Sequence, residues 1–450
     1  MNNRLLVSVF MSVLVPVSAW ALTVTCSEGG LEKAVTDKTV SELTISGAVD
    51  VRDFCFMAEE MPSLTDVDMS AAVIKGYTCA AAESYFGQRG SFAADAIPAY
   101  SFFGSKLKSI KLPASLKVIG VAAFAGCKSL GGVEIPSSVE TVGNSAFYSS
   151  AITAVNVPVK QIGEAAFAGC VELASVKIGS SVETVGNSAF AACPKLEMVE
   201  IAAASQLSSI GDEAFAGTSI TSFDFARCQK LVSVGKWAFA NTRIAVASLP
   251  KSLTDVPEGV YFGSGAAKTI IVPDDATVIG DYAYCNIGVT SATIPAKVEY
   301  IGDNAFDGAR LTELISKPLA VPSLGKEVFK GVNSDSRRAT LYVNENLVGE
   351  YSNASQWREF AIEVDPGLGV EYVAGNSGVR AHFDAAVLHI EAGSRIETVL
   401  VADEAGRVVA SLLPLAEATA IDTHSFGGHM YVASVVLADG SVHKIKLLRK

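Results

Sequence analysis

Histidine is absent from the first 381 residues of this 450-residue chain, because its five histidines stand at positions 382, 389, 424, 429 and 443. Nucleophilic catalysis by a Ser–His or Cys–His pair is therefore excluded from most of the chain. The sequence also lacks a P-loop, a Rossmann glycine pattern and zinc-ligand spacing. Adjacent carboxylates such as Glu59-Glu60 and Asp274-Asp275 point apart in a strand or turn, which indicates solvated surface. We expect no catalytic residues, no metal and no cofactor; the alternatives are an unrecognised carboxylate site and a metal shared by His424 and His429.

Basic residues are in the minority, with 35 Lys and Arg against 47 Asp and Glu and a formal net charge of −12. No basic block is present, so the chain is a poor candidate for binding nucleic acid or an anionic membrane. Mean hydropathy is high, at +0.36. After residue 21, however, no apolar run reaches roughly 20 residues, the length that a membrane-spanning helix needs. We therefore predict no transmembrane segment.

The first 21 residues have the three parts of a secretory signal peptide. Arg4 supplies the positive charge, residues 5–17 are apolar, and Ala19-Trp20-Ala21 fits a cleavage site. The apolar run is too short for a membrane anchor. Thr25 stands where a lipoprotein would need a small residue before Cys26, so lipidation is not favoured. We predict that residues 1–21 direct secretion and are removed.

A six-residue pattern recurs along the middle of the chain: aliphatic, Gly, two free positions, Ala, aromatic. Residues 185–190 are one copy, and other strong copies begin at positions 119, 142, 162, 210, 234, 279 and 301. Weaker copies begin at Ile97, Val256 and Leu324. The aromatics stand 20 to 25 residues apart, at positions 102, 124, 147, 167, 190, 215, 239, 261, 284, 306 and 329. Such a period, held over this length, is typical of a solenoid whose repeats stack on one another.

The physics of one repeat predicts the roles of the motif residues. A single repeat cannot bury its apolar side chains, and stacking closes that surface into a continuous core. We expect Phe or Tyr to fill each layer, and the preceding Ala to be small because a larger side chain would crowd the next coil. The Gly supplies either a tight corner or a positive φ angle. A second element, L-x-x-V-x-I before Pro as in residues 107–113, predicts one short strand per repeat and hence a long parallel sheet.

Cysteines occur in two settings. We interpret residues 22–96 as an N-terminal cap with irregular first repeats, and it contains Cys26, Cys55 and Cys79. Export permits a disulfide between Cys26 and either of the other two, and buried free thiols are the equal alternative. In the array, three cysteines stand three residues after a layer aromatic, at the same corner of different coils: Cys127, Cys170 and Cys193. We interpret these as small apolar fillers rather than metal or redox ligands.

Residues 167–186 carry both repeat elements in one run, Phe-Ala-Gly-Cys-Val-Glu-Leu-Ala-Ser-Val-Lys-Ile-Gly-Ser-Ser-Val-Glu-Thr-Val-Gly. This run resembles the BspA-type leucine-rich repeat, a family found on bacterial cell surfaces and prominent in Bacteroidetes. The resemblance covers residues 40–365, and residues 339–343, Tyr351 and residues 357–360 resemble the family's closing coil. The copies at 256–262 and 320–329 depart from the pattern and predict irregular coils. The resemblance implies a leucine-rich-repeat solenoid, an arc of short parallel strands, with its array over residues 97–365.

The resemblance also implies that the strand face of the arc binds a protein or another macromolecule. A binding face carries convergent polar and aromatic groups on a rigid scaffold, and here the outward strand positions are mixed polar residues with few aromatics. The candidate ligand-binding residues, read by phase, are Lys108, Lys111, Glu134, Asn156, Lys177, Glu200 and Asp224. The alternative is that this column is an ordinary solvated sheet face.

The repeats stop before a Gly-rich linker at residues 366–378. Residues 379–450 then alternate like β-strands, with turns at 404–406 and 438–440, which predicts a small all-β, Ig-like sandwich. Residues 399–409, the segment Gly428-His429-Met430-Tyr431 and the basic end resemble the C-terminal sorting domain of type IX secretion. That resemblance implies export across the outer membrane, followed by release or surface attachment. The alternative is an Ig-like accessory domain.

The sequence therefore favours a secreted bacterial adhesin or interaction protein, at the outer-membrane surface or outside the cell, that is not an enzyme. Its partner is an extracellular protein or glycan, of the host matrix or of another bacterial cell, and nucleic acid is not expected. The alternative is a structural component of the envelope or matrix in which the repeat array is a spacer. The ligand and the oligomeric state are left open.

Overall fold

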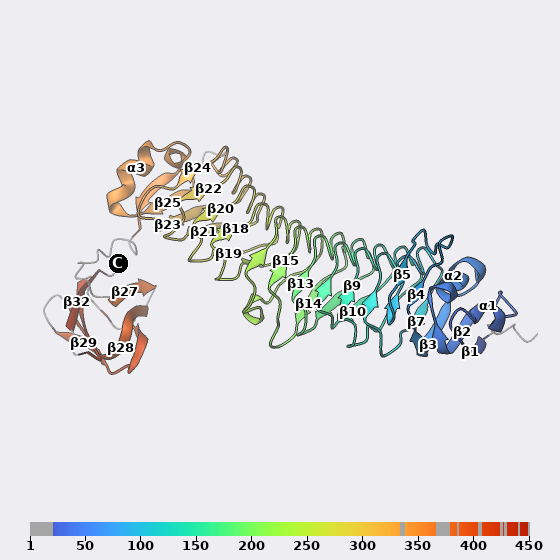
Figure 1. The fold of residues 1–450 in the computed structure, drawn as a ribbon. Helices are drawn as coiled ribbons and strands as arrows, with labels where there is room; N and C mark the ends of the chain where they lie inside the picture. The colour runs from blue at the N-terminus through green and yellow to red at the C-terminus, as the bar shows by residue number, and fades with distance from the viewer. Residues whose placement is uncertain are drawn as a thin grey trace, which may run out of the picture. The chain divides into compact units, whose positions relative to one another are not determined.

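The computed structural model describes residues 21–333, 338–365, 379–384, 387–403, 407–423, 426, 430–439 and 442–448 (Figure 1). The first 20 residues of the predicted signal peptide, the predicted linker at 366–378, the predicted turn at 404–406, His424, residues 427–429 and the last two residues lie outside this range. The chain divides into two units, residues 1–269 with 279–288 and residues 270–278 with 289–450.

The first unit opens with coils in which helices replace the repeat turn. β1 (Ala21–Cys26), β2 (Glu42–Val49), β3 (Asp66–Ile74) and β7 (Ser109–Lys111) form a parallel sheet. The helix α1 (Leu31–Ala34) follows β1, and α2 (Val51–Glu60) follows β2. A short hairpin of β4 (Tyr77–Thr78) and β5 (Ser91–Phe92) leaves the coil after β3. Sequence reasoning predicted irregular first repeats here and missed both helices.

Two aspartates fix the start of α2. The Arg52 amide donates a hydrogen bond to the Asp50 carboxylate at 2.9 Å, and the Asp50 amide donates to Asp53 at 2.9 Å. Asp53 also accepts hydrogen bonds from the amides of Gly29 and Leu31, each at 2.8 Å. One buried carboxylate thus satisfies three backbone donors and ties the start of α1 to the start of α2.

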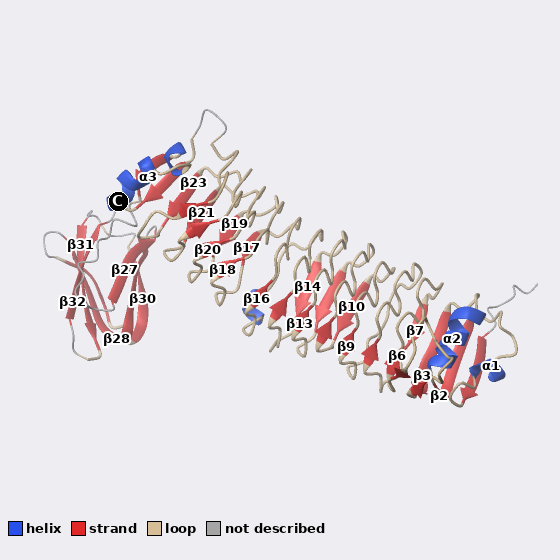
Figure 2. Cartoon of the chain, turned by 45° about the horizontal axis from the view of Figure 1, so that its top comes forward, coloured by secondary structure: helices blue, strands red, loops and turns tan. Residues whose placement is uncertain are grey.

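Later coils of this unit contribute to parallel ladders of short strands joined by long loops (Figure 2). Two-residue strands pair in the order β16-β15-β13-β11-β9-β8-β6, and longer ones in the order β10-β12-β14. The first ladder comprises β6 (Ala96–Ile97), β8 (Val118–Ile119), β9 (Thr141–Val142), β11 (Gln161–Ile162), β13 (Thr184–Val185), β15 (Ser209–Ile210) and β16 (Ser233–Val234). The second comprises β10 (Ala154–Val157), β12 (Ser175–Ile178) and β14 (Met198–Ile201).

The predicted strand is not present in every coil. The described segment 131–136 forms no strand. In the coil after β14, residues 218–224 form no strand either, and a 3₁₀ turn η1 (Phe225–Arg227) follows them. The unit continues with β17 (Val246–Ser248) and β18 (Asp255–Val256), and β19 (Thr269–Ile271) and β20 (Val278–Ile279) stand where the units meet in sequence. Strand formation therefore varies from coil to coil while the repeat period is kept.

The layer aromatics of the first unit form a stacked column, as predicted. From Phe102 to Phe239, neighbouring rings have centroids 5.1 to 5.5 Å apart and planes within 11° of parallel. Tyr261 and Tyr284 extend the column, and the Ala before each strong-copy Phe is fully buried. Backbone hydrogen bonds fix this spacing, because the amide of each layer Phe from Phe102 to Phe239 donates to the carbonyl of the residue before the next layer aromatic, as Phe167 does to Ala189 at 2.8 Å.

The structure decides between the two roles left open for the motif glycine. Gly186 has an ordinary φ angle, but a Cβ there would lie 2.7 Å from the backbone carbon of Gly163 and 2.8 Å from the amide of Glu164. Close approach of the preceding coil therefore excludes a side chain. The positive φ angle falls two residues later, at Ser188 (φ 52°), and again at the glycine two residues after the layer aromatic, such as Gly169 (φ 68°).

All eight cysteines are free thiols, so the disulfide suggested for Cys26 is not present. Cys127, Cys170 and Cys193 are fully buried at the same corner of three different coils, as the filler interpretation requires. They also donate hydrogen bonds, because each thiol reaches the carbonyl of a Phe in an earlier coil at 3.0 to 3.2 Å. Serine and threonine occupy the same phase elsewhere, so the corner selects small donors rather than apolar groups alone.

The second unit contains the closing coils and the C-terminal domain. Its parallel sheet has the order β21 (Ser291–Ile294), β23 (Glu313–Ser316), β25 (Thr340–Val343) and β26 (Ala361–Val364), with β22 (Tyr300–Ile301) paired to β24 (Ser323–Leu324). Between β25 and β26 lie η2 (Glu345–Leu347), α3 (Val348–Asn353) and η3 (Trp357–Glu359). Trp357 packs 5.0 Å from Phe329 and covers the last aromatic layer of the array. The coils expected to be irregular keep the column, since Tyr261 and Phe329 are both buried.

The C-terminal domain is all-β and antiparallel, as predicted. It consists of β27 (Val379–Asp384), β28 (Val387–Asp403), β29 (Val408–Leu412), β30 (Ala416–Asp422), β31 (Met430–Leu437) and β32 (Val442–Leu448). The long strand β28 pairs with β27 and β30 along its first half, and with β29 and β31 along its second half. Both halves share a core that includes Leu388, Val399 and Tyr431. Across the described residues of the whole chain, every helix is too short or too polar to cross a membrane.

Candidate functional site

Three of the predicted strand-face residues meet in the β10-β12-β14 ladder. Asn156 stands opposite Lys177, and Lys177 stands opposite Glu200. The Lys177 Nζ lies 3.1 Å from a Glu200 carboxylate oxygen, and both side chains are about half exposed. Their positions in the repeat therefore correctly predicted that these residues share one face. Lys177 and Glu200 form an ion pair, which leaves the face close to neutral at this point.

Lys111 is also paired on the same kind of strand. It ends β7, opposite Asp68 of β3, and its Nζ donates a hydrogen bond to the Asp68 carboxylate at 2.8 Å. That bond lowers the pKa of Asp68 to about 2 and raises the pKa of Lys111. Lys108 immediately precedes β7, where its amide donates to the Thr65 carbonyl at 2.7 Å and its side chain is exposed.

The two remaining predicted residues stand outside any strand. Glu134 is exposed within the described loop segment 131–136. Asp224 precedes η1 and forms an ion pair with Arg227 at 3.0 Å. The seven residues therefore do not form one continuous site, because the strand that would align Glu134 and Asp224 with the others is missing from their coils.

Sequence reasoning missed the exposed aromatics of the opposite part of the coil, the turn that carries the layer Phe. Phe103, Tyr100 and Tyr148 are 63%, 43% and 48% exposed. Phe103 and Tyr148 directly follow a layer Phe, at a position where five other coils carry a buried or half-buried Ala, namely Ala125, Ala168, Ala191, Ala216 and Ala240. That break in the Ala column is the sequence signal that would have found them. We call this part of the coil the turn face.

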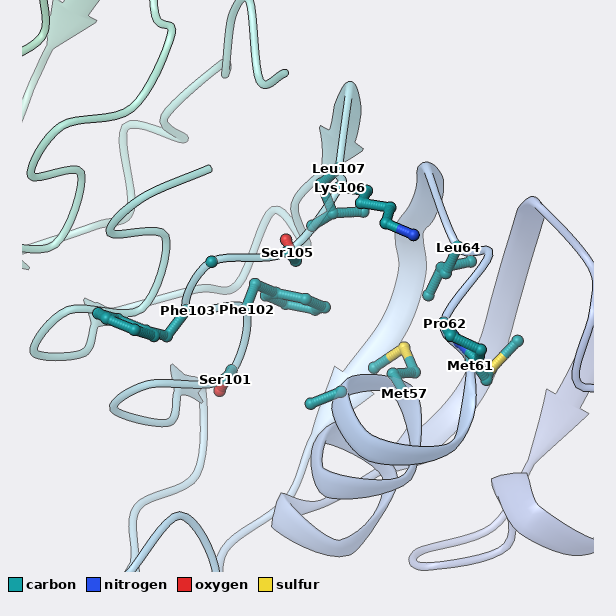
Figure 3. A pocket seen from close by; sticks show the side chains of 12 residues that line it. Met57, Met61, Pro62, Leu64, Ser101, Phe102, Phe103, Ser105, Lys106 and Leu107 are labelled. Carbon is teal, nitrogen blue, oxygen red and sulfur yellow. The ribbon is translucent and has the colours of Figure 1, made fainter. Parts of the chain in front are cut away.

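A pocket of about 270 Å³ opens beside Phe103 (Figure 3). Met57 of α2 and the following Met61, Pro62 and Leu64 form one wall, and residues 101–107 form the other. The pocket exists because α2 replaces the turn of an ordinary coil. The C-terminal end of α2 therefore does not pack closely against the turn that carries Phe102. Lys106 stands exposed at the rim. This geometry fits an apolar side chain of a partner.

The chemistry available elsewhere is limited. Within the described residues, no group of three or more His, Cys, Asp or Glu side chains is placed to hold a metal ion. In the pairing of β27 with β28, residue 382 stands opposite residue 389 in the backbone register. His424 and His429, the alternative metal pair, lie outside the described residues.

Comparison with known proteins identifies the repeat. The family described as BspA type leucine rich repeat region matches residues 95–207 and 208–336, in six copies. The chain belongs to the BspA-type leucine-rich repeat family. In this family context the stacked coils, the two strand ladders and the aromatic column are the structural form of the BspA-type repeat. A search of curated proteins returned no match.

Several solved structures are similar to the BspA-type chain. A leucine-rich repeat protein from Bacteroides ovatus is 19% identical, with a TM-score of 0.44, and the match covers 76% of this chain and 91% of the other. A leucine-rich cell surface protein from Faecalibacterium prausnitzii is 19% identical, with a TM-score of 0.32, covering 56% and 86%. The pneumococcal vaccine antigen PcpA is 16% identical, with a TM-score of 0.30, covering 52% and 79%.

Proposed function

We propose that this chain is a secreted or cell-surface interaction protein that binds an extracellular protein and acts as an adhesin, without catalysis. The observation that carries the proposal is the exposed pair of Tyr100 and Phe103 beside an apolar pocket. Their rings meet edge to face with centroids 6.3 Å apart. Large aromatics that fill or flank a pocket are the residues that dominate protein–protein binding energy.

The aromatic pair is held on a rigid backbone. The Tyr100 amide donates to the Val121 carbonyl at 2.9 Å, and the Gly104 amide donates to the Ala125 carbonyl at 2.8 Å. Phe102, between them, is buried in the aromatic column, 5.4 Å from Phe124. A partner therefore meets side chains whose positions are already fixed, which reduces the entropy lost on binding.

The strand face is the second surface that we propose for binding. Lys108, Lys111, Asn156, Lys177 and Glu200 lie on strands or at their starts, and two of the lysines are held by carboxylates. A partner that binds through these residues must supply charged groups that replace the Lys177–Glu200 and Lys111–Asp68 ion pairs. Exposed pairs of this kind contribute only about 0–1 kcal/mol each, so such replacement is feasible.

The test uses residues 22–450 and a panel of extracellular-matrix and plasma proteins. We expect saturable binding to at least one of them, weakened about tenfold or more by Phe103→Ala combined with Tyr100→Ala. The double change Lys177→Ala, Glu200→Ala tests the strand face in the same assay. Val171→Ala is the control, because Val171 is half exposed and stands apart from both surfaces. Binding that is indifferent to both double variants would reject both surfaces.

The observation that favours a structural role is the pairing of charges within the strand face. Lys177 with Glu200 and Lys111 with Asp68 neutralise each other, as expected of a spacer that must not attract partners. A folded, cooperatively melting chain that binds no protein of the panel but stays in the envelope fraction would support this second function.

Residues 379–450 are proposed to direct export across the outer membrane, as a type IX sorting domain. The support is the sequence resemblance and the antiparallel β-fold of the described strands. Deletion of these residues should leave the repeat protein inside the cell envelope, whereas an accessory domain could be deleted without changing surface display. Protease shaving of intact cells separates the two outcomes.

A further inference from the structure

Three aromatic side chains form a second cluster on the turn face, far along the chain from Phe103. The Trp237 ring lies 5.2 Å from the Phe262 ring, with planes 61° apart, and 5.9 Å from the Tyr282 ring, with planes 31° apart. Trp237 and Phe262 are partly exposed, and Tyr282 is 37% exposed. The aromatic column uses none of these rings, because Phe239, Tyr261 and Tyr284 fill those layers.

The register of the coils explains how rings from different coils meet. Trp237, Gly259 and Tyr282 each stand two residues before the layer aromatic, where the φ angle is positive in every coil. In the middle coil this residue is a glycine, and a Cβ there would lie 2.3 Å from the Trp237 indole. The indole therefore lies across Gly259 and reaches the coil of Tyr282. Bulky residues adopt positive φ angles at a cost in free energy, so their presence here calls for a reason.

A polar hollow of about 450 Å³ lies in the coils that carry Trp237 and Gly259. Its wall includes Asp212, Ser233, Lys236, Ser252, Asp255 and Glu258. Lys236 and Glu258, which line the hollow, come directly before Trp237 and Gly259 in the chain, so the hollow and the rings belong to the same coils. The hollow's volume is in the range of small-molecule sites, which is about 300–1,000 Å³.

We propose that Trp237, Phe262 and Tyr282, together with this hollow, form a binding site for neutral oligosaccharides. A pyranose ring has an apolar face of C–H groups and a rim of hydroxyls. The C–H face packs against aromatic faces, whose π-electrons attract the partly positive hydrogens. Hydroxyls then find carboxylate and hydroxyl partners in the hollow, which supply both donors and acceptors.

The charges of the hollow select neutral sugars. Asp212, Asp255 and Glu258 supply three carboxylates, and the cation beside them is already engaged. Lys236 donates a hydrogen bond from Nζ to Glu258 at 2.8 Å, and its amide donates to Asp212 at 2.8 Å. A sulfated or sialylated glycan would place its anionic groups against these carboxylates and be repelled.

The arrangement of the rings favours a sugar over an organic cation. A cation-binding cage needs aromatic walls that face each other around the charge. Trp237 and Tyr282 instead follow one another along the stacked coils with planes only 31° apart. Trp237 and Tyr282 thus form an extended aromatic surface, on which successive sugar rings can pack.

The experiment uses residues 22–450 on a printed array of neutral, sialylated and sulfated oligosaccharides. The best neutral binder is then titrated while tryptophan emission is recorded. Trp20 is absent from these residues and Trp357 is only 1% exposed, so a change in emission reports Trp237. We expect binding to neutral oligosaccharides, with Kd raised at least about tenfold by Trp237→Ala or by Phe262→Ala. Trp237→Phe should retain part of the affinity.

Tyr148→Ala is the matched control, because it removes an exposed aromatic from the same face at a distant coil. The melting temperature of each variant establishes that the array is folded. The proposal is overturned if the folded chain binds no neutral glycan, if only anionic glycans bind, or if both Trp237→Ala and Phe262→Ala bind as the wild type does. Protein binding through Phe103 or the strand face is a separate measurement, so either proposal can fail while the other stands.

Discussion

The rings of Phe167 and Phe190 lie parallel, with centroids 5.3 Å apart and planes 4° from parallel. Twenty-three residues of chain separate them, yet their offset is the same as that of the pairs on either side. The ring spacing follows the stacking of the coils, because hydrogen bonds between coils hold the turns that carry the rings. The column is therefore the feature on which the stability of the array depends most directly.

Phe190→Ala should lower the free energy of unfolding by about 3–5 kcal/mol, because it opens a cavity in a fully buried layer. Neighbouring coils stabilise each other in a solenoid, so the loss extends to the coils above and below. Denaturant unfolding followed by circular dichroism measures the change. Val171→Ala, at an exposed position of the same coil, should change it by less than about 0.5 kcal/mol. Equal effects of the two substitutions would contradict the role of the column.

Gly186→Ala should destabilise the protein, although Gly→Ala ordinarily stabilises by reducing the entropy of the unfolded chain. The added Cβ would meet backbone atoms of Gly163 and Glu164 at 2.7 and 2.8 Å, which cannot move aside without separating the coils. Gly131 is the control, since a Cβ there meets nothing within 4 Å. Gly131→Ala should leave the melting temperature unchanged or raise it. A Gly186→Ala protein as stable as the wild type would refute close coil contact.

Asp53→Ala should destabilise the N-terminal cap by at least about 2 kcal/mol. It removes the acceptor of three backbone amides, those of Gly29, Leu31 and Asp50, and each buried donor left without a partner costs about 1–3 kcal/mol. Hydrogen exchange at these amides should speed up before the array unfolds. Glu60→Ala removes only an exposed partner of Lys38 and should have little effect. Unchanged exchange at Leu31 in the Asp53 variant would contradict this account.

The thiols of the array should resist modification at pH 8. Burial raises the pKa of Cys193 to about 12 and that of Cys228 to about 11, so neither is a thiolate there. In the unfolded chain a thiol ionises near its ordinary pKa of 9.0. A raised pKa in the folded state means that stability is fully present below pH 9 and is lost progressively as pH rises toward 12.

Ellman's reagent measures this difference. In the folded protein at pH 8 we expect Cys79, which is half exposed, to react before the buried thiols. All eight thiols should react after unfolding in guanidinium chloride. Rapid reaction of Cys127, Cys170 or Cys193 in the folded protein would show that the corner they occupy is open to solvent. Replacing Cys193 by Ala should reduce the loss of stability between pH 9 and 12.

The sequence alone determined the period, the layer aromatics and the strand phase. These features depend on burial within a coil and against its nearest neighbours. The same residue pattern recurs in many coils, so the structural role of each position can be inferred from its repetition. Phe167 and Phe190 in the column, and Lys177 opposite Glu200, follow from phase in this way. The helices of the cap escaped the same reasoning, because α1 and α2 belong to coils that do not repeat.

The tertiary structure decided what one coil does to another. Gly186 and Gly169 look alike in sequence, but contact with the preceding coil requires the first, whereas the second has a positive φ angle that Ser149 and Ala192 also adopt at the same phase. The loss of strand at Glu134 and Asp224 splits the predicted binding column. Trp237 reaches Tyr282 only because Gly259, from the coil between them, leaves room for the indole. Such contacts depend on side chains that more than twenty residues of chain separate, and only the stacking of the coils brings them together.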